Sequence, residues 1–131
     1  MARDYAQETQ KRVAFLKQVL TDCHANGFVF GNSGGKDSAL VGILCRMATE
    51  NTLGVVMPCS SKRNYGEDRD DGLALAKQFD IKNIEVDLTA SKQAVLDAIT
   101  PVQTATDPAA GNIAPRLRMT TLYTIGQSLG Y

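Results

Sequence analysis

The residues with the clearest chemical potential form one short stretch near the start of the chain. Its members are Gly31, Asn32, Ser33, Gly34, Gly35, Lys36, Asp37 and Ser38. An apolar run, Phe28 to Phe30, precedes it, and a helix-like run from Asp37 to Cys45 follows it, which indicates a strand, a tight turn and a helix. Glycines allow positive φ and close approach to a ligand, and a helix N-terminus directs N–H groups and a positive dipole end at that ligand. This arrangement favours a phosphate site.

Two side-chain types in the stretch extend the chemistry. Ser33 and Ser38 add hydroxyl donors. Asp37 would repel a phosphate unless a cation lay between them, and Mg²⁺ binds carboxylate and phosphate oxygens together. We therefore expect ATP or pyrophosphate bound with Mg²⁺, with Asp37 as the metal ligand. The alternative is a plain strand–turn–helix connection whose glycines serve only the turn.

The spacing of the stretch differs from two common nucleotide motifs. It fits neither Gly-x-x-x-x-Gly-Lys-Ser/Thr nor Gly-x-Gly-x-x-Gly. Ser-Gly-Gly-x-Asp-Ser at 33–38 instead resembles the pyrophosphate loop of the N-type ATP pyrophosphatases. These enzymes cleave ATP between its α and β phosphates and adenylate a substrate. The resemblance implies that residues 31–38 bind the phosphates of ATP.

A second informative segment runs from Gly111 to Leu129 and predicts a helix with Asn112 as its N-cap. Arg118 falls on the apolar stripe of that helix, where a guanidinium is costly unless it is paired or hydrogen-bonded. We expect Arg118 to cap backbone carbonyls or to meet a buried carboxylate. Arg116 lies nearer the edge of the stripe. Its planar guanidinium suits two alternatives, a structural role or the binding of a ligand carboxylate or phosphate.

Composition and charge restrict the class of protein. The chain has 131 residues, of which 44% are hydrophobic and 21% charged, which indicates a single globular domain over residues 1–131. Fourteen basic and fourteen acidic residues cancel, which argues against a nucleic-acid partner. No apolar run has transmembrane length and the N-terminus does not resemble a signal peptide, so no membrane partner is expected.

Three separated cysteines make a zinc site or disulfide framework unexpected and suit the cytoplasm. Cys23 and Cys45 fall in helical patterns and are expected in the core, whereas Cys59 falls in a loop that exposes it.

The surrounding pattern alternates helices with strands. Strands are predicted at 28–31, 52–57 and 83–88, and helices at 1–26, 37–50, 67–79, 90–99 and 111–129, with an Asn-Gly cap after the first helix and a linker at 100–110. Such alternation predicts an α/β fold, a parallel sheet with helices on both faces and the strands in chain order. The glycine stretch then lies at the carboxyl edge of the sheet, where such folds bind ligands. The acidic run after Gly66 is interpreted as a solvated helix start.

Several segments together resemble the ammonia-dependent NAD synthetase family. They are the stretch at 33–39, Val-Met-Pro at 56–58, Gly-Asn-x-x-x-Arg-x-Arg-Met at 111–119, and Leu-Tyr at 122–123. The resemblance implies a Rossmann-like, adenine nucleotide alpha hydrolase-like fold and ATP-dependent amidation of deamido-NAD. It also implies ATP and Mg²⁺ as cofactors, Asn112 and Arg116 as deamido-NAD ligands, and a homodimer. Because no glutaminase-like segment is visible, free ammonia is the expected nitrogen source.

The sequence departs from that family at Asn32, where an aliphatic residue is usual, and at Pro115, where alanine is usual. In the family a further strand with another metal-binding glutamate follows the point where this sequence stops, Tyr131. We therefore expect a truncated domain that is inactive alone and leaves its first strand at the sheet edge. Another adenylating enzyme, of the GMP synthetase or tRNA-modifying kind, and a non-catalytic nucleotide-binding fragment remain as alternatives. Neutral charge disfavours tRNA, and the segment at 112–119 disfavours both enzyme alternatives.

Overall fold

A parallel three-stranded sheet organises the chain. The computed structural model describes residues 2–60 and 66–131. Its strands are β1 (Phe28–Gly31), β2 (Thr52–Val56) and β3 (Lys82–Glu85), arranged in the order β1-β2-β3 with both pairings parallel. The predicted α/β class and strand order are therefore confirmed. In the described sheet β1 lies at an edge, as expected.

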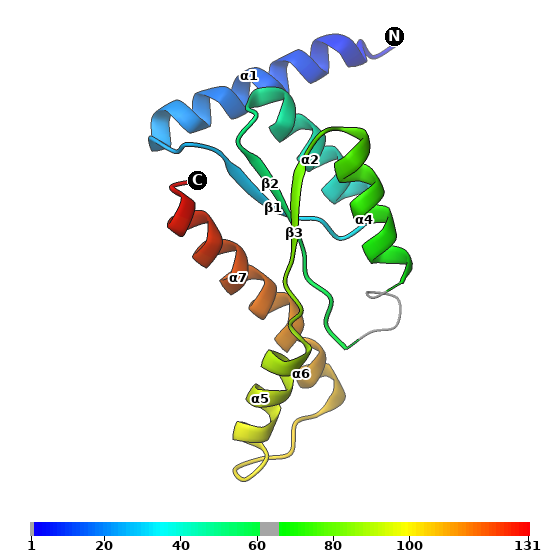
Figure 1. Cartoon of the computed structure of the whole chain (residues 1–131), viewed down its shortest axis with the longest axis vertical. Coiled ribbons are helices and arrows are strands. Elements are labelled where there is room, and N and C mark those ends of the chain that lie inside the picture. The colour runs from blue at the N-terminus through cyan, green and yellow to red at the C-terminus, as the bar shows by residue number, and fades with distance from the viewer. Residues whose placement is uncertain (1, 61–65) are drawn as a thin grey trace.

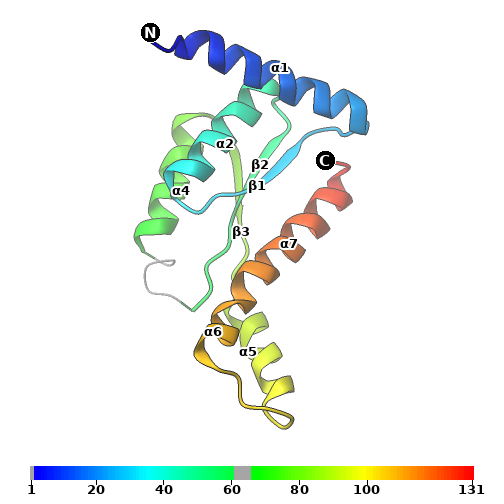
Figure 2. The ribbon, with the colours of Figure 1, turned by 180° about the vertical axis from the view of Figure 1, so that it is seen from behind.

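Helices cover both faces of this sheet. They are α1 (Tyr5–Cys23), α2 (Lys36–Ala48), α4 (Glu67–Gln78), α5 (Thr89–Ile99), α6 (Asp107–Gly111) and α7 (Ile113–Leu129). In Figure 1 α2 and α4 lie on one side of the strands and α7 on the other, while α1 crosses the far end of α2. Seen from behind in Figure 2, α5 and α6 extend below the sheet and lead into α7.

Alternating side chains of the strands divide the core between the two faces. Leu53, Val55 and Met57 form one buried cluster, on which Leu122 and Ile125 of α7 pack. Phe30 faces the other way and forms a second cluster with residues of the α4–β3 region. All residues of β2 are buried, which confirms the expectation drawn from its continuous apolar run.

Three boundary predictions are wrong, and helix capping explains two of them. The first helix ends at Cys23 and not at Asn26–Gly27, because His24 takes the left-handed conformation at φ 52° and caps the helix. The expected 100–110 linker contains most of α6, whose N-cap Thr106 accepts a hydrogen bond from the Ala109 N–H. Strand β3 ends at Glu85, before the predicted Leu88.

The cysteines also differ from expectation. Cys23 is exposed and Cys59 is buried, so both predictions were wrong, whereas Cys45 is buried as expected. Burial raises the pKa of the Cys45 thiol to about 11. Because the thiol then stays protonated near neutral pH, Cys45 is a packing residue and not a nucleophile.

Candidate nucleotide-binding site

The glycine stretch forms the connection between β1 and α2. Gly34 has φ +81°, and a Cβ atom placed on it would lie 2.6 Å from the Asp68 carbonyl oxygen. Position 34 therefore requires glycine for both its backbone conformation and its close approach to α4. Gly35 is different, because it is extended at φ −82° and is the N-cap residue of α2.

Two serine hydroxyls converge at the start of α2. The Oγ atoms of Ser33 and Ser38 lie 2.9 Å apart, and the Ser38 hydroxyl donates to the Gly35 carbonyl at 3.1 Å. The Gly35 N–H in turn donates to Ser33 Oγ at 3.3 Å. Within the described chain no side chain caps α2, so its first-turn N–H groups are left for a ligand. Residues 31–38 thus form a tight strand-to-helix turn, and phosphate binding there stays a prediction.

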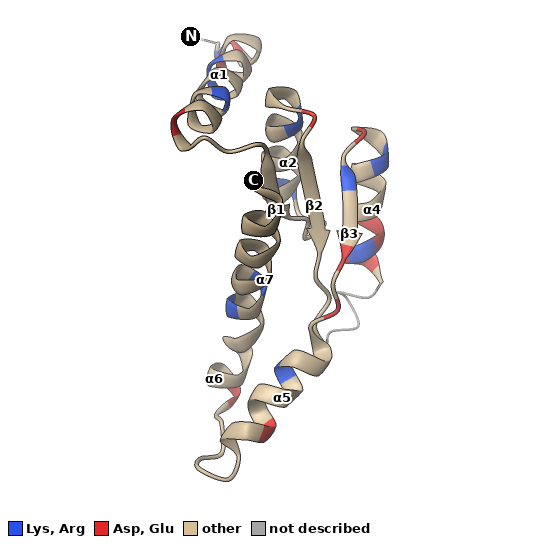
Figure 3. Ribbon diagram, turned by 60° about the vertical axis from the view of Figure 1, so that its left-hand side comes forward, with Lys and Arg blue, Asp and Glu red and all other residues tan. Residues whose placement is uncertain are grey.

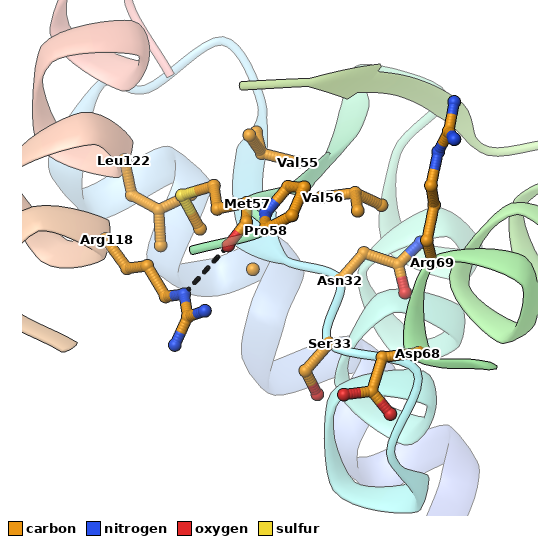
Figure 4. Close-up of a pocket in the computed structure, with 11 residues that line it drawn as sticks. Asn32, Ser33, Val55, Val56, Met57, Pro58, Asp68, Arg69, Arg118 and Leu122 are labelled. Atoms are coloured by element: carbon orange, nitrogen blue, oxygen red, sulfur yellow. Dashed lines mark hydrogen bonds between the residues drawn. The ribbon is translucent and has the colours of Figure 1, made fainter. Parts of the chain in front are cut away.

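A cavity of about 200 Å³ opens beside this loop. Figure 4 shows its lining side chains. They come from the carboxyl ends of two strands, the start of α4 and the inner face of α7: Gly31, Asn32, Ser33, Val55, Val56, Met57, Pro58, Asp68, Arg69, Arg118 and Leu122. Because parallel strands end at one edge of the sheet, the cavity occupies the place where α/β folds bind ligands.

Arg118 forms one wall of the cavity. Its Nε donates to the Met57 carbonyl oxygen at 3.0 Å, which confirms that it bonds a backbone carbonyl. Figure 4 places its guanidinium across the cavity from Asp68. The sequence favoured a structural role for Arg118 and did not indicate its position beside the cavity. The sequence feature that could have indicated this position is a guanidinium on an otherwise apolar stripe of the helix.

The opposite wall is the first turn of α4. Asp68 and Arg69 line the cavity, and Arg69 Nε donates to Glu85 Oε2 of β3 at 2.7 Å. Figure 3 shows this acidic helix start, together with the basic residues of α7. Interpreting the acidic run as merely solvated therefore missed that Asp68 faces the site. Its position after the second strand was the signal that could have identified it.

The two predicted deamido-NAD ligands lie elsewhere. Asn112 and Arg116 are exposed, and Arg116 Nη1 donates to the Asn112 carbonyl oxygen at 3.1 Å. They are adjacent to each other, but neither lines the cavity. Asn112 precedes α7, yet its side chain makes no cap hydrogen bond because the residue keeps helical angles between α6 and α7. The predicted capping bond is therefore wrong.

Asp37 is the predicted metal ligand. It is exposed in the first turn of α2, immediately after the phosphate loop. Among residues 2–60 and 66–131 no group of three or more metal-binding side chains is assembled. A single carboxylate beside a phosphate site nevertheless fits Mg²⁺, which commonly takes one or two carboxylates, phosphate oxygens and waters.

Comparison with known proteins identifies the family of the chain. A family model described as NAD synthase matches residues 8–131. The chain belongs to the NAD synthase family. The predicted membership of the NAD synthase family is thereby confirmed.

Two relatives show how much of the family the chain represents. The NH(3)-dependent NAD(+) synthetase of Carboxydothermus hydrogenoformans is 37% identical over 135 residues, which cover 100% of this chain and 54% of that protein. The corresponding protein of Finegoldia magna is 36% identical over 129 residues, covering 98% and 52%. The chain therefore spans about half the length of these NAD synthase relatives.

Solved structures share the fold of this NAD synthase family member. The NH3-dependent NAD synthetase from Campylobacter jejuni has a TM-score of 0.81 at 32% identity, covering 98% of this chain and 55% of that one. The NMN synthetase from Francisella tularensis has a TM-score of 0.89 at 26% identity, covering 98% and 52%. The observed architecture is thus a partial version of the family fold. No helix in the described ranges is long and apolar enough to cross a bilayer.

Proposed function

We propose that this chain provides the ATP-pyrophosphate site for amidation of deamido-NAD to NAD, with ammonia as nitrogen source and AMP and pyrophosphate as products. The observation that carries the proposal is the phosphate loop. Gly34 holds the required positive φ against α4, and the Ser33 and Ser38 hydroxyls meet at the uncapped start of α2. Family membership favours this reaction over GMP synthetase-like or tRNA-modifying chemistry.

The proposed reaction needs positioning more than proton transfer. The carboxylate of deamido-NAD is already ionised near neutral pH, so it can attack the α-phosphorus of ATP without a general base. The loop at 31–38 would hold the β and γ phosphates, and ammonia would then displace AMP from the adenylated substrate. Asp37 would hold Mg²⁺, which when bound neutralises phosphate charge. Lys36, exposed in the first turn of α2, would add a supporting positive charge.

The dinucleotide assignment is part of the same proposal. Asn112 and Arg116 offer an amide and a guanidinium on the exposed surface of α7. We also propose the homodimer and the cytoplasmic setting that the family resemblance implies.

Calorimetry on the 131-residue polypeptide tests the ATP assignment. ATP and pyrophosphate should bind more tightly with Mg²⁺ than without it, because the cation removes repulsion between Asp37 and phosphate. Asp37→Ala should abolish that Mg²⁺ dependence. Asp70→Ala, which removes an exposed carboxylate from the first turn of α4 outside the cavity lining, should keep it. Equal ATP affinity in wild type and Asp37→Ala, with and without Mg²⁺, would refute the proposal.

A further inference from the structure

Asn32 is a buried polar side chain at the point where β1 becomes the phosphate loop. It is only 2% exposed. Its backbone N–H donates to the Val55 carbonyl oxygen at 2.8 Å, which continues the β1–β2 hydrogen bonds by one residue. In Figure 4 its side chain points toward α4 and away from Arg118. The side chain is therefore turned from the open part of the cavity into the protein.

The Asn32 amide joins three elements. Its Nδ2 donates to the Gly72 carbonyl oxygen of α4 at 2.8 Å and to Asn83 Oδ1 of β3 at 3.2 Å. Two glycines make room for these bonds. A Cβ atom on Gly72 would lie 3.2 Å from Asn32 Cγ, and one on Gly54 would lie 2.8 Å from Asn83 Oδ1. One amide thus links the end of β1 to both α4 and β3.

A second contact joins the same parts of the molecule. Gly34 packs against the Asp68 backbone, so the loop meets α4 at two separate points. The first turn of α4 in turn carries Asp68 and Arg69 into the cavity wall. We propose that Asn32 is a positioning residue, whose side-chain amide holds the phosphate loop against α4 so that loop and cavity wall form one rigid unit. Its effect on ligand binding rests on the function proposed above.

The unpaired Oδ1 atom of Asn32 makes it possible to distinguish a positioning role from a contribution to stability. Asn32 Oδ1 is buried and has no hydrogen-bond partner among the described residues. A buried unpaired acceptor is costly, so an apolar side chain at position 32 would remove that cost, although it would also leave Asn83 Oδ1 without the Asn32 donor. Because these two effects oppose each other, Asn32→Leu should leave the melting temperature nearly unchanged while it loosens the loop. If Asn32 had only a structural role, the melting temperature and the mobility of the loop would change together.

Hydrogen exchange measured on the whole 131-residue polypeptide tests the positioning role directly. In Asn32→Leu, the amides of the loop and of the first turn of α4 should exchange about fivefold faster than in wild type. Local opening of the wild type must break the hydrogen bond between Asn32 and Gly72, and the variant lacks that bond. Thr52→Val is the matched control, since Thr52 is also 2% exposed and its Oγ1 donates to the Thr49 carbonyl oxygen at 2.9 Å, at the other end of β2. This control should leave exchange in the loop unchanged. Loop exchange in Asn32→Leu equal to that in wild type, or to that in Thr52→Val, would overturn the proposal.

A binding measurement distinguishes this proposal from the proposed function. With Mg²⁺-pyrophosphate as the probe, Asn32→Leu should bind about tenfold more weakly than wild type, and Thr52→Val equally well. No binding by wild type would overturn the proposed function, whereas the exchange result would still decide the role of Asn32. Should Asn32→Leu fail to fold, Gly72→Ala disturbs the same contact from the α4 side, because a Cβ atom there would lie 3.2 Å from Asn32 Cγ. Unchanged loop exchange in that variant would then overturn the proposal.

Discussion

At the scale of single residues, Gly34 determines the backbone path of the phosphate loop. It combines a φ of +81° with an approach to the Asp68 carbonyl that leaves no space for Cβ. Gly35 is extended, and a Cβ on it would meet only Ser33 Oγ, at 3.4 Å. The two neighbouring glycines therefore differ in what they require, although the sequence motif presents them as equivalent.

Alanine substitutions at these two glycines should separate their roles. Gly34→Ala should lower the unfolding free energy by about 1–3 kcal/mol, because left-handed backbone strain and a steric clash add together. Gly35→Ala is the matched control and should change it by less than about 1 kcal/mol. Urea denaturation followed by circular dichroism measures both. Equal losses in the two variants would contradict the assignment of strain to Gly34.

The sequence placed the loop at 31–38 between a strand and a helix, but it did not place two of the charged residues that line the cavity. Residues 31–38 share one local motif, and local chain geometry is sufficient to place the loop between a strand and a helix. Asp68 and Arg118 reach the same cavity from remote segments, so their positions depend on tertiary packing. Asn32 is intermediate. Its departure from an aliphatic type was visible in the sequence, but its bond to Gly72, 40 residues away, was not.

At the scale of secondary-structure elements, helix α7 has two different faces. Leu122 and Ile125 pack on the sheet beside Arg118, whose Nε bonds the Met57 carbonyl, while Arg116 and Tyr123 lie on the exposed side. Helical periodicity predicted this division, because apolar residues recurred on one stripe. Leu122 and Ile125 contact the β2 cluster, so the sheet covers this part of the stripe.

The two arginines of α7 should therefore respond differently to alanine. Arg118→Ala should lower the unfolding free energy by about 1–2 kcal/mol, because it removes the hydrogen bond to Met57 and the packing of the side-chain stem. Arg116→Ala should change it by less than about 0.5 kcal/mol, because its side chain is exposed. Thermal unfolding measures both effects, and titration with deamido-NAD should show weaker binding for Arg116→Ala. The opposite pattern would show that the faces of α7 are misassigned.

Element boundaries were predicted less well than element types. The α6 helix was missed because the segment from Thr100 to Ala110 has few large apolar residues, although Thr106 followed by Asp107 and Pro108 is a typical helix start. His24 ended α1 early by taking a left-handed conformation that its residue type only weakly suggests. Capping geometry of this kind depends on a few backbone hydrogen bonds, which periodicity does not reveal.

At the scale of the whole molecule, the main feature is the unpaired edge of the described sheet at β1. Within the described sheet β1 pairs only with β2, although Phe28 and Val29 are apolar like residues of a central strand. A hollow of about 460 Å³ lies beside this edge, lined by β1 residues and by Tyr123 and Tyr131. Unpaired strand edges attract other chains, particularly when the neighbouring surface is apolar. The chain also spans only about half the length of its relatives.

We therefore expect the 131-residue polypeptide to self-associate through the β1 edge and to make no NAD from ATP, Mg²⁺, deamido-NAD and ammonia. Sedimentation velocity should show association that increases with concentration, and Tyr123→Glu should reduce it by placing a charge in the hollow. Phe15→Glu is the matched control, because Phe15 on α1 and Tyr123 are each 67% exposed and Phe15 does not line the hollow. If the polypeptide stays monomeric at every concentration, or if both variants weaken association equally, the β1 edge is not the associating surface. NAD formation by such a monomer would show that the described half of the fold suffices for the whole reaction.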